Sequence, residues 1–152
     1  MEPSAPARVL VVANRTAATP ALLQAVSERA ARGRATFTLL VPRIAHGLQR
    51  YVDPEDADDT EAQAVLELAL PLLEEAAGAH VEGKIGDANP GDAIHDAMNL
   101  EGYDEIIIST LPARVSRWLH ADLPRKLKPL GVPITTITAK SARFRHASRH
   151  ST

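Results

Sequence analysis

Residues 104–127 read Asp104-Glu-Ile-Ile-Ile-Ser-Thr-Leu-Pro-Ala-Arg-Val-Ser-Arg-Trp-Leu-His-Ala-Asp-Leu-Pro-Arg-Lys-Leu127. The apolar run at 105–110 predicts a strand covered on both faces, the basic residues after it predict a loop, and Asp122 before Pro124 predicts a helix start. In an open α/β sheet, ligands bind at the carboxyl end of such a strand. Yet no glycine occurs between positions 103 and 130, although a phosphate-binding loop uses glycines so that backbone N–H groups reach the anion.

The rest of the chain repeats this alternation of strand and helix. Four more apolar runs predict strands, at residues 8–13, 35–41, 80–85 and 132–138. Helical patterns lie between them, at 20–32 after Thr19, at 60–77 with Thr60 as N-cap, from Asn89-Pro90 onward, and from Asp122 to near Gly131. This order predicts a single α/β domain, a doubly wound, Rossmann-like five-stranded parallel sheet.

Composition narrows the function classes. The chain has 152 residues, 45% hydrophobic and 24% charged, and a formal net charge of −2. Aromatic residues make up only 3%, which disfavours stacking platforms for nucleic-acid bases. Without cysteine, disulfides, thiol catalysis and thiolate metal sites are excluded. No apolar run is long enough for a membrane span, so we expect a cytoplasmic protein with no membrane or nucleic-acid partner.

Three segments, at residues 1–7, 53–61 and 140–152, differ in composition from the rest of the chain. We expect a disordered N-terminus at residues 1–7, an α/β domain at 8–139 and a basic flexible tail at 140–152, which has four basic residues, two histidines and no acid. Residues 53–61 carry six acidic residues in nine positions, and we expect them to form a mobile loop. The sequence assigns no role to either charged segment.

Residues 8–139 resemble the universal stress protein family. The matching motifs are Gly86-Asp87, Asp92-Ala93-Ile94, Tyr103-Asp-Glu-Ile-Ile-Ile108, Ser116-Arg117 with Leu119, Lys126 and Val132-Pro133-Ile134. The resemblance implies strand order 3-2-1-4-5, a role in stress response and a homodimer formed through the edge strand at 132–138. An unpaired β-branched edge of this kind is suited to pairing across a two-fold axis.

The same resemblance argues against the usual mode of ATP binding. Members that bind ATP carry Gly-x2-Gly-x9-Gly-Ser/Thr after the fourth strand, and an ungapped alignment places these positions on Ile108, Leu111, Ala121 and Asp122. Such members also tend to carry Asp after the first strand, where this chain has Asn14. Larger side chains would fill the phosphate space, and Asp122 would repel phosphate at a helix N-terminus. We therefore expect no cofactor.

The implied strand order places a crevice between the first and fourth strands. Its candidate lining residues are Asn14, Arg15, Thr16, Ser109, Thr110, Arg114, Ser116, Arg117 and Asp122. Three arginines near hydroxyl groups can hold an anion through charge-assisted hydrogen bonds. In the alternative interpretation, the arginines are solvated and one of them pairs with Asp122.

Three other groups of residues are weaker candidates for a functional site. Asp92, His95 and Asp96 share a polar helix face, which is usually solvated, and we expect no metal site. Trp118-Leu119-His120 is interpreted as a loop anchored by a buried indole, with a surface recognition site as the alternative. No Gly-x-Ser-x-Gly elbow exposes Ser109 or Ser116, so we do not expect an enzyme.

Two function classes remain open. The first is a non-catalytic stress-response module that dimerises and engages an unknown protein partner. The second is a sensor that binds a nucleotide or another small anion in the arginine-lined crevice. The missing glycines favour the first class, and the arginines favour the second.

Overall fold

The computed structural model describes residues 5–43, 54–110 and 127–138. Its five strands are all parallel and lie in the order β3-β2-β1-β4-β5. The predicted doubly wound α/β fold and strand order are therefore confirmed. In chain order, the elements are β1 (Ala7–Val12), α1 (Pro20–Arg32), β2 (Ala35–Pro42), α3 (Pro54–Ala77), β3 (Val81–Gly86), α4 (Pro90–Leu100), β4 (Glu105–Thr110), the 3-10 turn η1 (Lys128–Leu130) and β5 (Ile134–Thr138).

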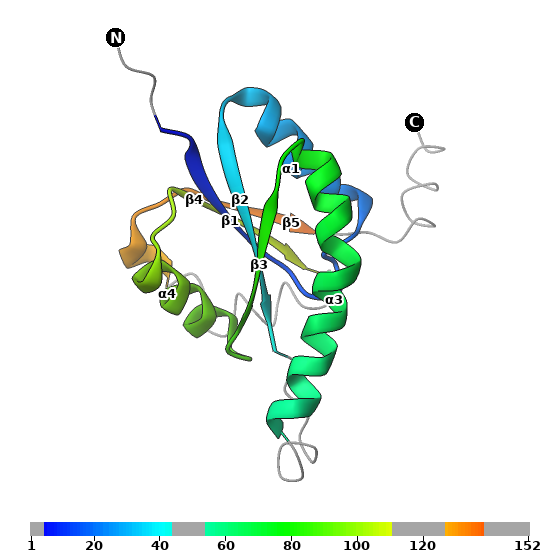
Figure 1. Ribbon diagram of the computed structural model, residues 1–152. Helices are drawn as coiled ribbons and strands as arrows, with labels where there is room; N and C mark the ends of the chain where they lie inside the picture. The colour runs from blue at the N-terminus through cyan, green and yellow to red at the C-terminus, as the bar shows by residue number, and fades with distance from the viewer. Residues whose placement is uncertain (1–4, 44–53, 111–126, 139–152) are drawn as a thin grey trace, which may run out of the picture.

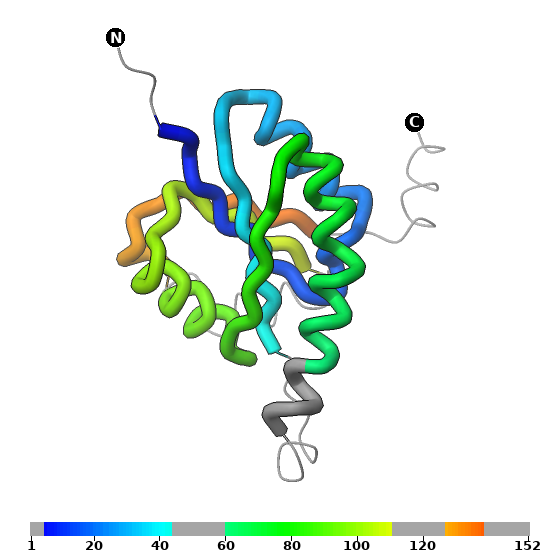
Figure 2. Tube along the Cα trace, viewed as in Figure 1, coloured from blue at the N-terminus to red at the C-terminus, as the bar shows by residue number. Residues whose placement is uncertain are grey.

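Helices cover both faces of the sheet (Figure 1). Successive side chains of a strand point to opposite faces, so the apolar residues of β1 alternate between the two faces of the sheet. Val9 and Val11 belong to a core shared with α1 and α3, whereas Leu10 and Val12 belong to a core shared with α4. The chain trace shows α1 and α3 on one side of the sheet and α4 on the other (Figure 2). Double coverage explains why β1 is a continuous apolar run.

The sheet has its topological switch point at β1. This strand pairs with β2 on one side and with β4 on the other, with Val12 opposite both Leu40 and Ile108. Strand order reverses there, and in open α/β sheets the carboxyl ends of the strands at such a point are where ligands bind. The register, extended by two residues, places Asn14 beside Thr110.

The start of α4 was predicted correctly and depends on close packing. Asn89 is the N-cap, and its Oδ1 accepts a hydrogen bond from the backbone N–H of Asp92 at 3.1 Å. Pro90 occupies the first helical position, as its fixed φ favours. A Cβ added to Gly86 would lie 2.8 Å from the Cβ of Ala93, so only glycine lets α4 approach β3 this closely.

The prediction for residues 53–61 was wrong. Helix α3 begins at Pro54, so most of this acidic segment is helical, and Thr60 lies inside the helix and is not its N-cap. Proline is suited to a first helical position, and acidic residue types are favourable in a first turn. A high density of acidic residues is also typical of a mobile loop, which is why the sequence predicted a loop here. At α1, Thr19 is the N-cap, but its hydroxyl donates to the carbonyl of Thr16 instead of capping the helix.

The carboxyl-terminal unit is described only from Leu127. The helix predicted from Asp122 lies mainly outside the described residues, and the part that is described ends in η1, with Gly131 at φ 69°. Strand β5 lies at the sheet edge and begins at Ile134, two residues later than predicted. The homodimer through residues 132–138 stays a prediction, and the tail at 140–152 lies outside the described residues. Among the described helices, none combines the length and the apolar character needed to cross a bilayer.

Candidate functional site

Two buried polar atoms lie at the carboxyl ends of β1 and β4. Asn14 donates through Nδ2 to the carbonyl oxygen of Pro42 at 2.6 Å, which ties the loop after β1 to the end of β2. A carbonyl only accepts, so this bond fixes the amide orientation and leaves Oδ1 of Asn14 as an acceptor. That Oδ1 is buried and has no hydrogen-bond partner within the described part of the chain, and the same holds for Oγ1 of Thr110.

The other two crevice residues that the structure describes as buried satisfy each other. The hydroxyls of Thr16 and Ser109 lie 2.7 Å apart, and both side chains are buried. Ser109 alternates with Thr110 along β4, so it faces the α1 side of the sheet, whereas Thr110 shares the α4 side with Ile108. The predicted crevice residues thus divide between the two faces. Among the crevice residues that the structure describes, only Asn14 and Thr110 have a buried side-chain polar atom without a partner.

The remaining predicted residues have different outcomes. Arg15 is exposed at the crevice. Arg114, Ser116, Arg117 and Asp122 lie outside the described residues, so an anion clamp of three arginines stays a prediction. Pro42 was not among the predicted residues. It directly follows the apolar run at 35–41, so its place at the carboxyl end of a predicted strand could have indicated it.

The first position of the glycine motif can be placed in the structure, and its surroundings differ from those that the sequence alignment suggests. Ile108 lies inside β4, opposite Val12 and Thr136, and is 3% exposed in the core beneath α4. Its side chain therefore fills the core and not the space of a phosphate, which corrects the expectation for this residue. Leu111, Ala121 and Asp122 lie outside the described residues, and the loss of the usual ATP mode stays a prediction.

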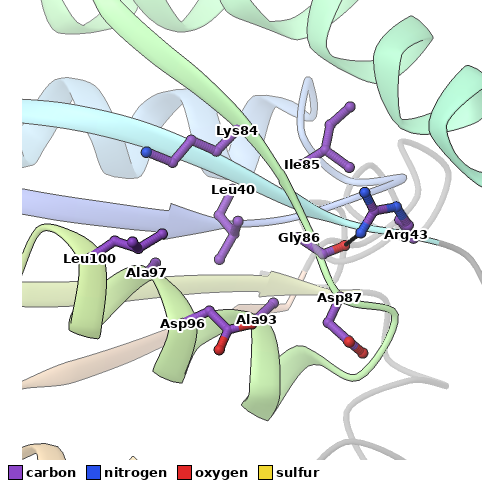
Figure 3. A pocket seen from close by; sticks show the side chains of 10 residues that line it. All are labelled: Leu40, Arg43, Lys84, Ile85, Gly86, Asp87, Ala93, Asp96, Ala97 and Leu100. Atoms are coloured by element: carbon purple, nitrogen blue, oxygen red, sulfur yellow. Dashed lines mark hydrogen bonds between the residues drawn. The ribbon is translucent and has the colours of Figure 1, made fainter.

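A groove of about 230 Å³ runs between α4 and the strands β2 and β3 (Figure 3). Its apolar floor includes Leu40, Ala93 and Ala97. Arg43 closes one end, where its Nη1 donates to the carbonyl oxygen of Gly86 at 3.2 Å. The groove is smaller than most small-molecule pockets, which range from about 300 to 1,000 Å³.

A charged cluster at the opposite end of the sheet connects α4 to β1 and β3. The carboxylate of Glu101 accepts from Lys84 Nζ at 2.7 Å, from the Tyr103 hydroxyl at 2.9 Å and from Arg8 Nη2 at 3.3 Å. The guanidinium of Arg8 also lies 5.2 Å from the centroid of the Tyr103 ring. These contacts join three elements of the fold, so we interpret the cluster as structural.

The cluster shifts the acid–base properties of its members. The hydrogen bond from Lys84, followed by that from Tyr103, holds the pKa of the Glu101 carboxyl below its ordinary value of 4.5. The same bond raises the pKa of Lys84. A carboxyl whose pKa is lower in the folded state stabilises the protein above its unfolded pKa, and that stability is lost as pH falls through the folded pKa.

Replacing Glu101 by glutamine should therefore reduce the acid sensitivity of the fold. Between about pH 5 and pH 3, the wild-type protein should lose a share of its free energy of unfolding that Glu101→Gln does not lose. Urea unfolding at both pH values measures this difference. The exposed Glu82 is the matched control, and Glu82→Gln should retain the wild-type difference. Equal acid sensitivity in Glu101→Gln and the wild type would contradict the structural role of the cluster.

The possible metal ligands named from the sequence are Asp92, His95 and Asp96 of α4. Across residues 5–43, 54–110 and 127–138, no group of three or more His, Cys, Asp or Glu side chains is arranged to hold a metal ion. Asp92 and Asp96 are exposed on α4, and His95 between them is half-buried.

Comparison with solved structures places this geometry among known folds. A universal stress protein from Archaeoglobus fulgidus in complex with dAMP has a TM-score of 0.62 and 18% identity, covering 88% of this chain and 98% of that one. A universal stress protein in complex with cAMP has a TM-score of 0.59 and 16% identity, with 90% and 100% coverage. A universal stress protein family protein from Arabidopsis thaliana with AMP bound has a TM-score of 0.58 and 16% identity, with 91% and 95% coverage.

These similarities are structural and are not accompanied by sequence matches. No protein-family model matches the sequence, and no curated protein matches it. Each of the three structures is matched over nearly its whole length. The chain has the fold of the universal stress proteins.

Proposed function

We propose that this protein is a stress-response module of the universal stress type that binds a nucleoside monophosphate in the crevice between β1 and β4. The observation that carries the proposal is the pair of buried atoms without partners, Oδ1 of Asn14 and Oγ1 of Thr110. A buried polar atom without a hydrogen bond costs about 1–3 kcal/mol. A ligand that bonds to both atoms would recover that free energy.

The two atoms favour a nucleoside over a bare anion. Oδ1 of Asn14 only accepts hydrogen bonds, so the ligand must present a donor, such as a ribose hydroxyl or a base amino group. The Thr110 hydroxyl can donate or accept. Inorganic phosphate offers few donors at neutral pH and repels an amide oxygen. The exposed Arg15 at the same end of the sheet is suited to a phosphate group. Three proteins of the same fold were solved with dAMP, cAMP or AMP, which supports this ligand class.

The described crevice residues favour binding over catalysis. The Thr16 and Ser109 hydroxyls bond to each other at 2.7 Å, and a serine nucleophile needs a general base as its partner. Asn14 has no titratable group. We therefore propose that the protein senses its ligand and does not convert it, and that its output is the engagement of a protein partner.

Titration calorimetry with AMP, adenosine and inorganic phosphate tests the proposal. AMP and adenosine should release measurable heat and phosphate alone should not, because phosphate offers few donors at neutral pH and its negative charge repels Oδ1 of Asn14. At 100 times its Kd, AMP should raise the free energy of unfolding by about 2.7 kcal/mol. The absence of both heat and a thermal shift with millimolar AMP, cAMP or ATP would contradict the proposal. It would instead favour a stress-response module that works through a protein partner alone.

A further inference from the structure

Helix α3 has a buried inner face and an apolar outer face. Ala62, Leu66, Ala69 and Leu73 recur at helical spacing and pack in the core against β2, β3 and α1. On the opposite side of the helix, Ala64, Leu68, Pro71 and Leu72 are exposed, and we call these four residues the outer α3 face. Leu68 is 66% exposed and Leu72 is 37% exposed. An exposed stripe of this kind on a surface helix indicates an interaction site.

The charged residues of α3 itself all have one sign. Helix α3 contains no lysine, arginine or histidine, whereas Glu61, Glu67 and Glu75 lie along its exposed side. Glu61 and Glu75 each lie seven residues from Leu68, at either end of the apolar stripe. Glu75 is in the last turn, where the helix dipole disfavours a carboxylate and favours a cation. A basic partner would relieve this repulsion, whereas a second copy of the same acidic helix would increase it.

Pro71 removes one backbone hydrogen bond from α3. Pro71 lies inside α3 and has no N–H group, so the carbonyl oxygen of Glu67 receives no hydrogen bond from position 71. A carbonyl that lacks its helical donor can accept from a Lys or Arg side chain, each of which supplies several donors. The outer α3 face itself combines apolar area with flanking carboxylates.

We propose that the outer α3 face is the docking site for an amphipathic basic helix of a partner protein. The partner helix would place leucine-type side chains against Leu68 and Leu72 and lysine or arginine side chains beside Glu67 and Glu75. Helices that carry an apolar stripe with charged flanks pair in this way, with packing supplying affinity and charge supplying orientation. The site is on the side of α3 opposite the residues that pack in the core and does not depend on nucleotide binding in the crevice.

A synthetic helical peptide of about 18 residues, with leucines on one face and lysines on the other, tests this site. Its affinity for the full-length protein is measured by fluorescence anisotropy at two salt concentrations. The wild-type protein should bind it, and added salt should weaken binding because the flanking charges are exposed. The double variant Leu68→Gln/Leu72→Gln should bind at least about tenfold more weakly. A peptide of the same composition in scrambled order should bind as weakly to the wild-type protein.

The chain supplies a matched control in Leu100 of α4, which is 76% exposed on the other side of the sheet. Leu100→Gln should leave the peptide affinity within about twofold, since it is far from α3. Equal binding by the wild type and the double variant would overturn the proposal by showing that the peptide is held by net charge alone. Failure of the wild type to bind, or a dimer that dissociates in the double variant during sedimentation, would also overturn it.

Discussion

The Gly86→Ala variant should be less stable than the wild type by about 2 kcal/mol, within the usual cost of overpacking a core. An added Cβ would lie 2.8 Å from the Cβ of Ala93 and 3.6 Å from its Cα. Ala93 has no flexible side chain that can move aside, so α4 as a whole must shift away from β3. The shift would also disturb the groove, whose floor includes Ala93.

Gly83 of the same strand is the control for this prediction. Its added Cβ would also meet an atom at 2.8 Å, but that atom is Cδ2 of Leu66, followed by Cδ1 of Leu70 at 3.0 Å. These are the ends of flexible side chains, so Gly83→Ala should cost less than about 1 kcal/mol. Urea unfolding of both variants measures the difference. Equal stability losses would contradict the view that close helix–strand contact requires Gly86.

The Thr110→Val variant should be more stable than the wild type and bind AMP more weakly. Valine has nearly the shape of threonine, so it retains the packing at the end of β4 and removes a buried hydroxyl that has no partner in the described structure. The free energy of unfolding should rise by about 1 kcal/mol. If the hydroxyl bonds to the nucleotide, affinity should fall about tenfold, which corresponds to about 1.4 kcal/mol. Such opposite effects are typical of residues retained for function.

The same substitution at Thr16 should have the opposite effect on stability. The Thr16 hydroxyl bonds to Ser109 at 2.7 Å, so Thr16→Val removes a buried hydrogen bond and leaves the Ser109 hydroxyl without its partner. The free energy of unfolding should fall by about 1–2 kcal/mol. Thermal unfolding of the two variants compares them directly. Destabilisation of Thr110→Val to the same extent would show that this hydroxyl already has a structural partner.

Much of the fold could be predicted because its signals are local. The continuous apolar runs at β1 and β4 indicate strands covered on both faces, and Asn89-Pro90 indicates the start of α4 from capping chemistry alone. The start of α3 was missed because acidic residues before Thr60 are equally typical of a loop and of a first helical turn. Sequence periodicity does not separate these two states.

The candidate site was predictable in position but not in its pairing. The switch point follows from strand order, which placed Asn14 and Thr110 together at the carboxyl ends of β1 and β4. Which hydroxyls satisfy each other depends on contacts between residues 93 positions apart, such as that of Thr16 with Ser109. The bond from Asn14 to the Pro42 carbonyl joins the loop after β1 to the end of β2, which no local pattern connects. The outer α3 face was not predicted, because the sequence does not distinguish its leucines from the core leucines of the same helix.

A crystal structure of the protein grown with AMP tests the central claim most directly. We expect a hydroxyl or amino group of the nucleoside to donate to Oδ1 of Asn14, and the Thr110 hydroxyl to form its own hydrogen bond to the same ligand. Electron density for AMP that lies only in the groove beneath α4, or a crevice in which both atoms stay without a ligand at saturating AMP, would contradict it.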